Sequence, residues 1–196
     1  NVNMYITFEE NGSPIANTSE LETHPRTTYV NENISLVTWK SGDDDARILY
    51  QFVDENGLVF PEPRTISDYD AIQTGPRVKR STAGDVFIQW TDLRHDPVDG
   101  DLYLQKIDVN GERQWGDGIQ VDPSDGVNFG GRFSADNNGG VNVFWEWGVY
   151  PNIDILFQSF NDLGAAALDE PIFISDAPGY QFAPNTISSN AGGVYA

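Results

Sequence analysis

Carboxylates are the residues of this chain best suited to acid–base chemistry. The segment WTDLRHDPVDGD, which begins at Trp90, places Asp92 and Asp101 at the two ends of one expected loop, with Arg94 near the first of them. Two carboxylates can act as acid and base in glycosidic bond cleavage, whereas Arg94 paired with Asp92 or Asp101 would pin the loop. Because similar loops recur along the chain, the structural interpretation is favoured and we assign no catalytic residue.

Two acidic clusters could supply oxygen ligands to a hard cation. They are Asp43, Asp44 and Asp45, and Asp96, Asp99 and Asp101. Calcium takes about six to eight oxygen ligands, but neither cluster has the spacing of an EF-hand loop. We expect solvated aspartates in exposed turns and no cofactor, with calcium as the alternative.

Aromatic and histidine side chains suggest ligand contact instead. Trp147 and Tyr150, in EWGVYPN, fall where the corresponding loop of another unit is polar, and His95 stands at a position where the units disagree. Exposed rings there could stack on a sugar, but a role in the core or between blades is favoured for Trp147 and Tyr150. His24 and His95 are the only histidines, at non-equivalent positions, so no zinc site is predicted. The chain has no cysteine and no GxSxG nucleophile motif.

The charge balance excludes one class of partner. Thirty acidic and eleven basic residues give a net charge of −19, and the acids are scattered along the chain. Nucleic-acid binding needs a positive surface that displaces counterions, so we exclude it and expect an acidic surface that keeps the protein soluble. No apolar run approaches the roughly 20 residues of a membrane helix, so no membrane insertion is expected.

The elements that position these side chains are expected to be β-strands. Within Asp85–Val121 an apolar run is followed by a polar turn and by a second run from Leu102 to Ile107. Asn110-Gly111 tolerates positive φ and closes a tight hairpin. A further strand is therefore expected through Gln114-Trp115 and Ile119–Val121.

The same unit recurs along the chain with a fixed register. Turn glycines Gly57, Gly111 and Gly164 are spaced by 54 and 53 residues. Six residues before each stands a glutamine, which we expect to be buried and bonded to backbone groups: Gln51, Gln105 and Gln158. Further upstream, tryptophans expected to pack between sheets end the apolar runs: Trp39, Trp90 and Trp145.

Each unit also has a short strand candidate ahead of the tryptophan run. These candidates are Pro25–Val30, Pro76–Arg80, Gly131–Ala135 and Pro184–Ser188. Four strands and no helix in about 53 residues are typical of a β-propeller blade, so an all-β propeller with four-stranded antiparallel blades is predicted. A sandwich of the same strands is the alternative, although it would not require so regular a period.

The boundaries of the units divide one propeller region over residues 1–196. We expect a partial blade at 1–22, blades at 23–73, 74–127 and 128–180, and a partial blade at 181–196. The last run stops inside a strand, which favours a part of a larger propeller. A closed four-bladed propeller, with the two partial blades paired, is the alternative.

The best copy of the unit resembles a blade repeat of large secreted propellers from Bacteroidota-like bacteria, which often carry a type IX secretion sorting tail. The pattern is W-x-D-x-R, D-[IL]-Y-x-Q, N-G, W and G-[IV]-x-V. It is carried by Trp90, Asp92, Arg94, Asp101, Leu102, Tyr103, Gln105, Asn110, Gly111, Trp115, Gly118, Ile119 and Val121. The other two copies are looser: one has Glu146 and Gly148 in place of the aspartate and arginine, and the other has Arg47 in place of the turn aspartate. The resemblance implies export and a propeller fold, and little about activity.

Three functions remain open from the sequence. The first is a non-enzymatic binding or scaffolding module of a larger secreted or cell-surface protein, joined to further blades of the same polypeptide and presenting loops to a protein or glycan. The second is a carbohydrate-active, glycosidase-like propeller enzyme, which needs two carboxylates from different blades at the channel mouth. The third is a structural subunit of a surface or secretion assembly.

Overall fold

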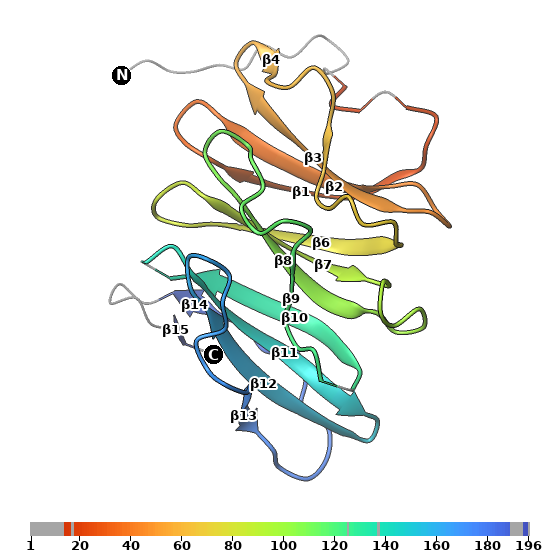
Figure 1. The fold of residues 1–196 in the computed structure, drawn as a ribbon, viewed down its shortest axis with the longest axis vertical. Helices are drawn as coiled ribbons and strands as arrows, with labels where there is room; N and C mark the ends of the chain where they lie inside the picture. The colour runs from red at the N-terminus through yellow and green to blue at the C-terminus, as the bar shows by residue number, and fades with distance from the viewer. Residues whose placement is uncertain (1–13, 17, 125, 137, 189–193, 196) are drawn as a thin grey trace.

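Every regular element of the chain is a β-strand in the computed structural model, which describes residues 14–16, 18–124, 126–136, 138–188 and 194–195. The strands form three antiparallel sheets that follow one another along the chain, and a two-stranded sheet comes last (Figure 1). Within the described ranges no helix is long and apolar enough to cross a membrane. The all-β, antiparallel architecture predicted from the repeats is confirmed.

The three large sheets have the same strand order. Sheet 1 contains β1 (Glu22–Tyr29), β2 (Ser35–Ser41), β3 (Arg47–Asp54), β4 (Gly57–Leu58) and β5 (Arg64–Thr65), and both β4 and β5 pair with β3. Sheet 2 contains β6 (Gln73–Arg80), β7 (Val86–Asp92), β8 (Asp101–Ile107) and β9 (Ile119–Gln120). Sheet 3 contains β10 (Asn128–Ala135), β11 (Val141–Val149), β12 (Asn152–Phe160) and β13 (Ile172–Ser175). The last sheet pairs β14 (Ile187–Ser188) with β15 (Val194–Tyr195).

Each of the first strands β1, β6 and β10 contains a β-bulge. The register shifts between Thr23 and Arg26, between Thr74 and Arg77, and between Phe129 and Arg132. One residue of each bulge has positive φ: His24 (55°), Gly75 (64°) and Gly130 (66°). Since a bulge adds one residue and re-aims the next side chain, pairing continues on both sides of it. The first strands therefore begin three residues earlier than predicted.

The outermost strand of sheet 2 is shorter than predicted. In sheet 2 only Ile119 and Gln120 form β9, whereas Arg113 makes an isolated bridge to Ile107. Trp115 lies between the two, and its ring is buried against the neighbouring sheet. The segment bends because Trp115 and its neighbours bond to a side chain rather than to the strand ladder, as described below.

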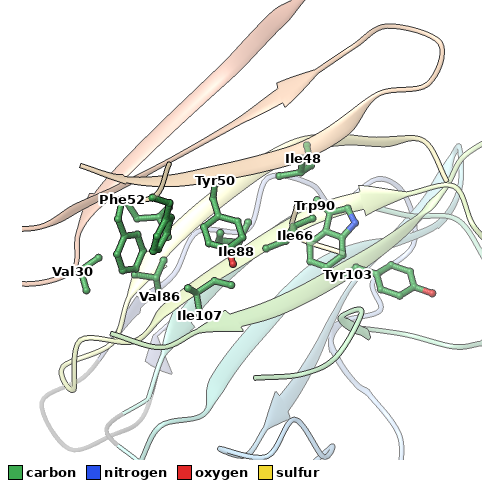
Figure 2. Packing of buried hydrophobic residues seen from close by; sticks show 12 residues of the cluster. Val30, Ile48, Tyr50, Phe52, Ile66, Val86, Ile88, Trp90, Tyr103 and Ile107 are labelled. Carbon is green, nitrogen blue, oxygen red and sulfur yellow. The ribbon is translucent and has the colours of Figure 1, made fainter. Parts of the chain in front are cut away.

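The first hydrophobic core cluster lies between sheets 1 and 2 (Figure 2). Sheet 1 contributes Ile48, Tyr50 and Phe52, and sheet 2 contributes Ile88 and Trp90. All five are buried. Burial of each large apolar side chain stabilises the fold by about 2–3 kcal/mol, so this cluster holds the two sheets face to face.

The second core cluster lies between sheets 2 and 3 and uses the opposite face of sheet 2. Phe87 alternates with Val86 and Ile88 along β7, and Leu104 alternates with Tyr103 along β8. Side chains that alternate along a strand point to opposite faces of a sheet. Sheet 2 is therefore covered on both faces, as expected of a blade between two neighbours.

The sheets converge along their first strands. β1 approaches β6, β6 approaches β10 and β10 approaches β14, while the fourth strands lie at the far edges of their sheets. This arrangement is propeller-like, with the first strands toward the axis. The pairing that would close a four-bladed ring involves residues 1–13, which lie outside the described residues.

A buried glutamine holds the outer segment of each sheet. Gln105 Nε2 donates to Gly116 O (2.8 Å), while Gln105 Oε1 accepts from the backbone nitrogens of Trp115 (2.9 Å) and Lys106 (3.0 Å). Gln51 and Gln158 make the corresponding bonds in sheets 1 and 3. Each side chain thus replaces several strand-to-strand bonds, which explains the short outer strands.

The turn glycines pack against the preceding sheet as well as closing a turn. Gly111 has φ 83° and lies against the ring of Phe60, and Gly164 has φ 80° and lies against Trp115. Phe60 and Trp115 are equivalent residues, because the backbone nitrogen of each bonds to its sheet's glutamine. Gly57 also has positive φ, but apart from its chain neighbours no atom of the described residues lies within 4 Å of the space a Cβ would occupy there.

Candidate functional site

Residues singled out from the sequence gather on one side of the sheets. The turns that join second and third strands contain Asp43–Asp45, the segment 93–100 and Tyr150-Pro151. All three turns lie on the right-hand side of Figure 1. The connections from one sheet to the first strand of the next reach the same side, so this is the loop face on which a binding site would form.

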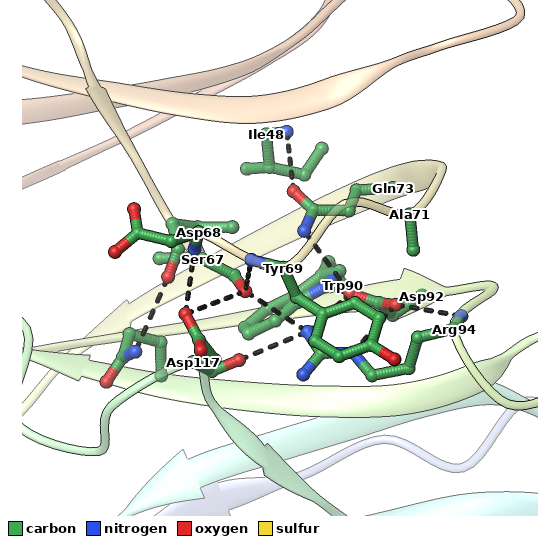
Figure 3. Close-up of polar contacts among 12 residues, drawn as sticks. Ile48, Ser67, Asp68, Tyr69, Ala71, Gln73, Trp90, Asp92, Arg94 and Asp117 are labelled. Atoms are coloured by element: carbon green, nitrogen blue, oxygen red, sulfur yellow. Dashed lines mark hydrogen bonds and ion pairs between the residues drawn. The ribbon is translucent and has the colours of Figure 1, made fainter.

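Asp92 is the centre of a buried polar network at this face (Figure 3). Its Oδ2 accepts from Trp90 Nε1 (2.9 Å) and Arg94 Nη2 (2.7 Å), and its Oδ1 accepts from Arg94 N (3.0 Å) and Nε (2.9 Å). Burial raises the pKa of Asp92, but the bonds from Arg94 and Trp90 outweigh burial and lower it overall. Asp92 is therefore an ionised, fully engaged carboxylate.

The same network ties sheet 2 to sheet 1. Gln73 Nε2 donates to Asp92 Oδ2 (3.3 Å), and Gln73 Oε1 accepts from Ile48 N (3.0 Å). The Arg94 guanidinium lies over the rings of Tyr103 and Tyr69, 4.2 and 4.5 Å from the centroids. These contacts leave neither Asp92 nor Arg94 free for a ligand, and they give the pair the structural role that its sequence pattern predicted.

Asp101 is the carboxylate of the loop that does not pair with Arg94. It lies opposite Asp92 in the β7–β8 register, but Arg94 pairs with Asp92 alone among the described residues. Asp101 is 6% exposed and lines a cavity of about 450 Å³ with His95 and Asp96. Desolvation is the main reason that the pKa of Asp101 is raised, and the charges of Asp96 and Asp122 add to it. His95 and Asn128 act in the opposite direction.

The other acidic residues of the predicted cation clusters are turn residues. Asp43, Asp44 and Asp45 are exposed, and Asp43 lies 3.9 Å from Lys40 Nζ. Asp96 Oδ1 accepts from Val98 N (2.9 Å) and Asp99 N (3.2 Å). Across the described ranges, no three His, Cys, Asp or Glu side chains come together to hold a metal ion. Neither cluster presents the oxygen shell that calcium takes.

The loop that was expected to contain Trp147 begins only after Val149. Trp147 belongs to β11, is half-buried against the second core cluster, and its ring meets Phe173 edge-on with centroids 6.0 Å apart. Because β11 and β12 pair as far as Val149 and Asn152, the hairpin is longer than its sequence suggested. Trp147 does line a groove of about 670 Å³ between β9 and β13.

Tyr150 is at the tip of that hairpin and begins a cluster of exposed aromatic rings. Tyr150 is 78% exposed, Tyr180 46% and Phe182 63%. The Tyr150 and Tyr180 rings meet edge-on with centroids 6.0 Å apart, and Tyr180 stacks on Phe182 at 4.9 Å. The segment is anchored to β12, since Gln181 N donates to Ile153 O (2.9 Å). We call Tyr150, Tyr180 and Phe182 the aromatic cluster.

A second group of residues at the converging first strands was missed by sequence reasoning. Arg26, Arg77 and Arg132 line one cavity of about 250 Å³. Each arginine is the first residue after the bulge of its strand. The signal was present in the sequence: the residue after Pro25, Pro76, Gly131 and Pro184 is Arg, Arg, Arg and Asn. We call this space the arginine cavity.

The fold and the loop face define a propeller-like all-β protein, and two solved structures share that fold. One is an endo-arabinase from Bacteroides thetaiotaomicron VPI-5482, with a TM-score of 0.53 and 14% identity over 94% of this chain and 74% of that enzyme. The other is the polysaccharide lyase PL25-Ulvanlyase, with a TM-score of 0.58 and 12% identity over 82% of this chain. This chain spans only 45% of the length of the lyase. At these identities the likeness shows the fold alone.

Sequence comparisons add no assignment. No protein-family model matches the chain, and no curated protein matches it.

Proposed function

We propose that this chain is a polysaccharide-binding segment of a propeller, with the aromatic cluster as its contact surface. The observation that carries this proposal is three exposed rings in mutual contact at the loop face. Rings left in water without a protein partner mark a binding surface, because burying their apolar faces is favourable. The flat faces of sugars, which carry C–H groups, suit such rings.

The solved structures support the choice of a glycan over a protein partner. Both bear the names of carbohydrate-acting enzymes and have the same arrangement of sheets. We further propose that other blades of the same polypeptide complete the propeller, and that the protein is secreted or lies at the cell surface. A closed four-bladed ring is the alternative to further blades.

Binding to a panel of polysaccharides tests the proposal. In affinity electrophoresis, wild-type protein is expected to be retarded by at least one neutral or acidic polymer, and Tyr180→Ala is expected to reduce the retardation. Tyr29→Ala is the matched control, since Tyr29 is 61% exposed but lies on β1 outside the aromatic cluster. Equal loss in both variants, or no retardation by any polymer, would refute the proposal.

Asp101 favours a second candidate function, cleavage of the bound polymer. A carboxyl whose pKa is raised by burial retains a proton that it can donate to a leaving oxygen. Burial shifts the pKa of Asp101 in the direction that this role needs, and Asp101 lines a cavity beside His95. It would act as the general acid of a carbohydrate-active enzyme.

The two candidates give different results with one variant. If the protein is an enzyme, Asp101→Asn abolishes the release of reducing ends or unsaturated products but leaves binding intact. If it is a binding segment, the wild type releases no product from any polymer that it binds. Product release that Asp101→Asn leaves unchanged would exclude Asp101 as the acid.

A further inference from the structure

The basic side chains of this acidic protein divide into two groups. Six of the eleven form ion pairs with carboxylates: Lys40, Arg47, Arg64, Arg94, Lys106 and Arg113. The other five have no ion pair among the described residues, and all of them lie on the first strands: Arg26, Arg77, Lys79, Arg80 and Arg132. Unpaired positive charge is thus concentrated where the sheets converge.

Four of these five side chains line the arginine cavity. They are Arg26 from β1, Arg77 and Lys79 from β6, and Arg132 from β10. The rest of the lining consists of apolar residues with Asn185 and Thr186, and it contains no carboxylate. Arg80, the fifth unpaired basic residue, does not line the cavity. Its Nε donates to Val30 O (2.8 Å), and its guanidinium lies over the ring of Tyr29.

The bulges hold the guanidinium groups in place while leaving most of their donors available. Arg26 Nη1 donates to Pro25 O (2.9 Å), and Arg132 Nη1 donates to the carbonyl oxygens of Gly130 and Gly131 (3.0 Å each). Arg77 makes no side-chain hydrogen bond within the described part of the chain. A guanidinium carries five N–H donors, so each of the three arginines has several left for a ligand.

The electrostatics of the cavity favour an anion. Desolvation, then the charges of Arg132 and Arg26, lower the pKa of Arg77. Like charges held together raise the free energy of the empty site, and a bound anion would remove that penalty. The planar fork of an arginine also matches the oxygens of a carboxylate or a similar oxyanion.

We propose that the arginine cavity binds the carboxylate or sulfate groups of an acidic polysaccharide. The inference rests on the proposed function, because the anionic groups are those of the bound glycan. One segment links the two sites: Phe182 of the aromatic cluster lies three residues before Asn185 of the cavity. A polymer that crosses the aromatic cluster can therefore place a charged group in the cavity.

A polymer suits the cavity better than a free anion. The net charge of −19 opposes the approach of any anion to this protein, a charged polymer included, unless other contacts offset the repulsion. A charged group tethered to a chain that already contacts the aromatic cluster has a high effective concentration at the cavity. Binding is accordingly expected to need both the ring contacts and the charge.

The test uses two pairs of polymers that differ only in charge: polygalacturonate against its methyl ester, and dextran sulfate against dextran. Binding of the whole chain is measured by affinity electrophoresis and by titration calorimetry at about 50 and 200 mM salt. The charged member of at least one pair is expected to bind about tenfold more tightly at low salt, and the difference is expected to shrink at high salt. Equal binding of both members of each pair overturns the inference.

Single-residue variants test whether the arginine cavity causes the tighter binding of the charged polymer. Arg77→Gln and Arg132→Gln are each expected to weaken binding of the charged polymer about tenfold, the scale of a lost hydrogen bond to a charged group. Binding of the neutral polymer is expected to stay unchanged. Arg113→Gln is the matched control, because it removes the same charge from a side chain already paired with Asp68. Arg77→Lys keeps the charge, and partial retention of binding with it supports an ionic site even if Arg77→Gln folds poorly.

The outcomes separate this inference from the proposed function. If neutral polymers bind through Tyr180 and no polymer responds to Arg77→Gln, the inference is wrong and the proposed function stands. If no polymer binds at all, both are wrong. If sodium sulfate alone binds as tightly as dextran sulfate and Arg77→Gln abolishes both, the cavity is a site for a free anion and the assignment to a polysaccharide is wrong.

Discussion

Asp92 and Asp101 lie opposite each other across β7 and β8, yet the pKa of Asp92 is lowered and that of Asp101 is raised. The difference comes from their partners. Burial disfavours the ionised form of both, but Arg94 and Trp90 donate to Asp92, whereas Asp101 lies near two further acidic residues. One cross-strand pair therefore combines a structural carboxylate whose pKa is lowered with a buried carboxyl whose pKa is raised.

Asp92→Asn is expected to destabilise the fold by about 3 kcal/mol at pH 7, because Arg94 would lose its buried partner. The pKa of Asp92 is lower in the folded than in the unfolded state, so its contribution is fully present above about pH 4, near the ordinary aspartate pKa. That contribution is lost as the pH falls further. Urea unfolding from pH 7 to pH 2 should show the gap between variant and wild type closing. If the difference in stability between wild type and Asp92→Asn stayed constant with pH, the charge of Asp92 would not be the cause of that difference.

Asp101→Asn is expected to stabilise the fold at pH 7, the opposite of the effect expected of Asp92→Asn. The pKa of Asp101 is higher in the folded state, so wild-type stability falls as the pH rises from the ordinary aspartate pKa through the raised one. The neutral amide avoids this penalty, and the variant should unfold at higher urea than wild type at pH 7 but not at pH 3. Asp99→Asn, in the same loop and exposed, controls for the change in net charge. A gain of the same size from Asp99→Asn would contradict the role of burial.

Gly111→Ala is expected to lower the free energy of unfolding more than Gly57→Ala does, although the two glycines occupy equivalent turns of sheets 1 and 2 and both have positive φ. An alanine at either site takes the unfavourable left-handed conformation, at about 1–2 kcal/mol. At Gly111 the new Cβ also collides with the Phe60 ring, which adds about 1–3 kcal/mol of overpacking. At Gly57 the described residues, its chain neighbours apart, place no atom within 4 Å of the new Cβ. Thermal unfolding of the two variants checks the difference, and equal losses would mean that the Phe60 contact is unimportant.

Much of the fold could be predicted because its rules repeat in the sequence. The turn glycines, the glutamines and the tryptophans each recur at the same position in three units, so three kinds of residue indicate the same period. The tryptophans show the limit of that approach. Trp90 bonds to Asp92, two residues later, but by the strand register the corresponding residues in the other sheets are Ser41 and Trp147, so Glu146 does not take the place of the aspartate as expected. The indole nitrogens of Trp39 and Trp145 have no hydrogen-bond partner among the described residues.

The candidate sites were harder to predict because they depend on contacts between units. The aromatic cluster joins Tyr150 to Tyr180, which are thirty residues apart and belong to no shared motif. The arginine cavity needs three first strands to converge, and the arginine that recurs at one position of three units indicates a shared site only once that convergence is known. Trp147 was assigned to a loop by comparison with the polar loop of another unit, whereas the β11–β12 pairing continues past Trp147.

Gln105→Leu is expected to destabilise the fold by about 3 kcal/mol, and Gln158→Leu by less. Leucine fills the space of Gln105 but leaves the backbone nitrogens of Lys106 and Trp115 and the oxygen of Gly116 without their partner. An unsatisfied buried polar group costs about 1–3 kcal/mol. The bonds of Gln158 are only partly buried, so water can replace some of them.

Gln114→Leu is the control for the glutamine variants, because Gln114 lies in the same segment as Trp115 but is exposed. Urea unfolding should rank the losses as Gln105→Leu, then Gln158→Leu, then Gln114→Leu. Hydrogen exchange adds a local reading, since the Trp115 amide should lose protection in Gln105→Leu. If the Trp115 amide stays protected while overall stability falls, the loss arises from poor packing of leucine, and the glutamine does not hold the outer segment in the way that its hydrogen bonds indicate.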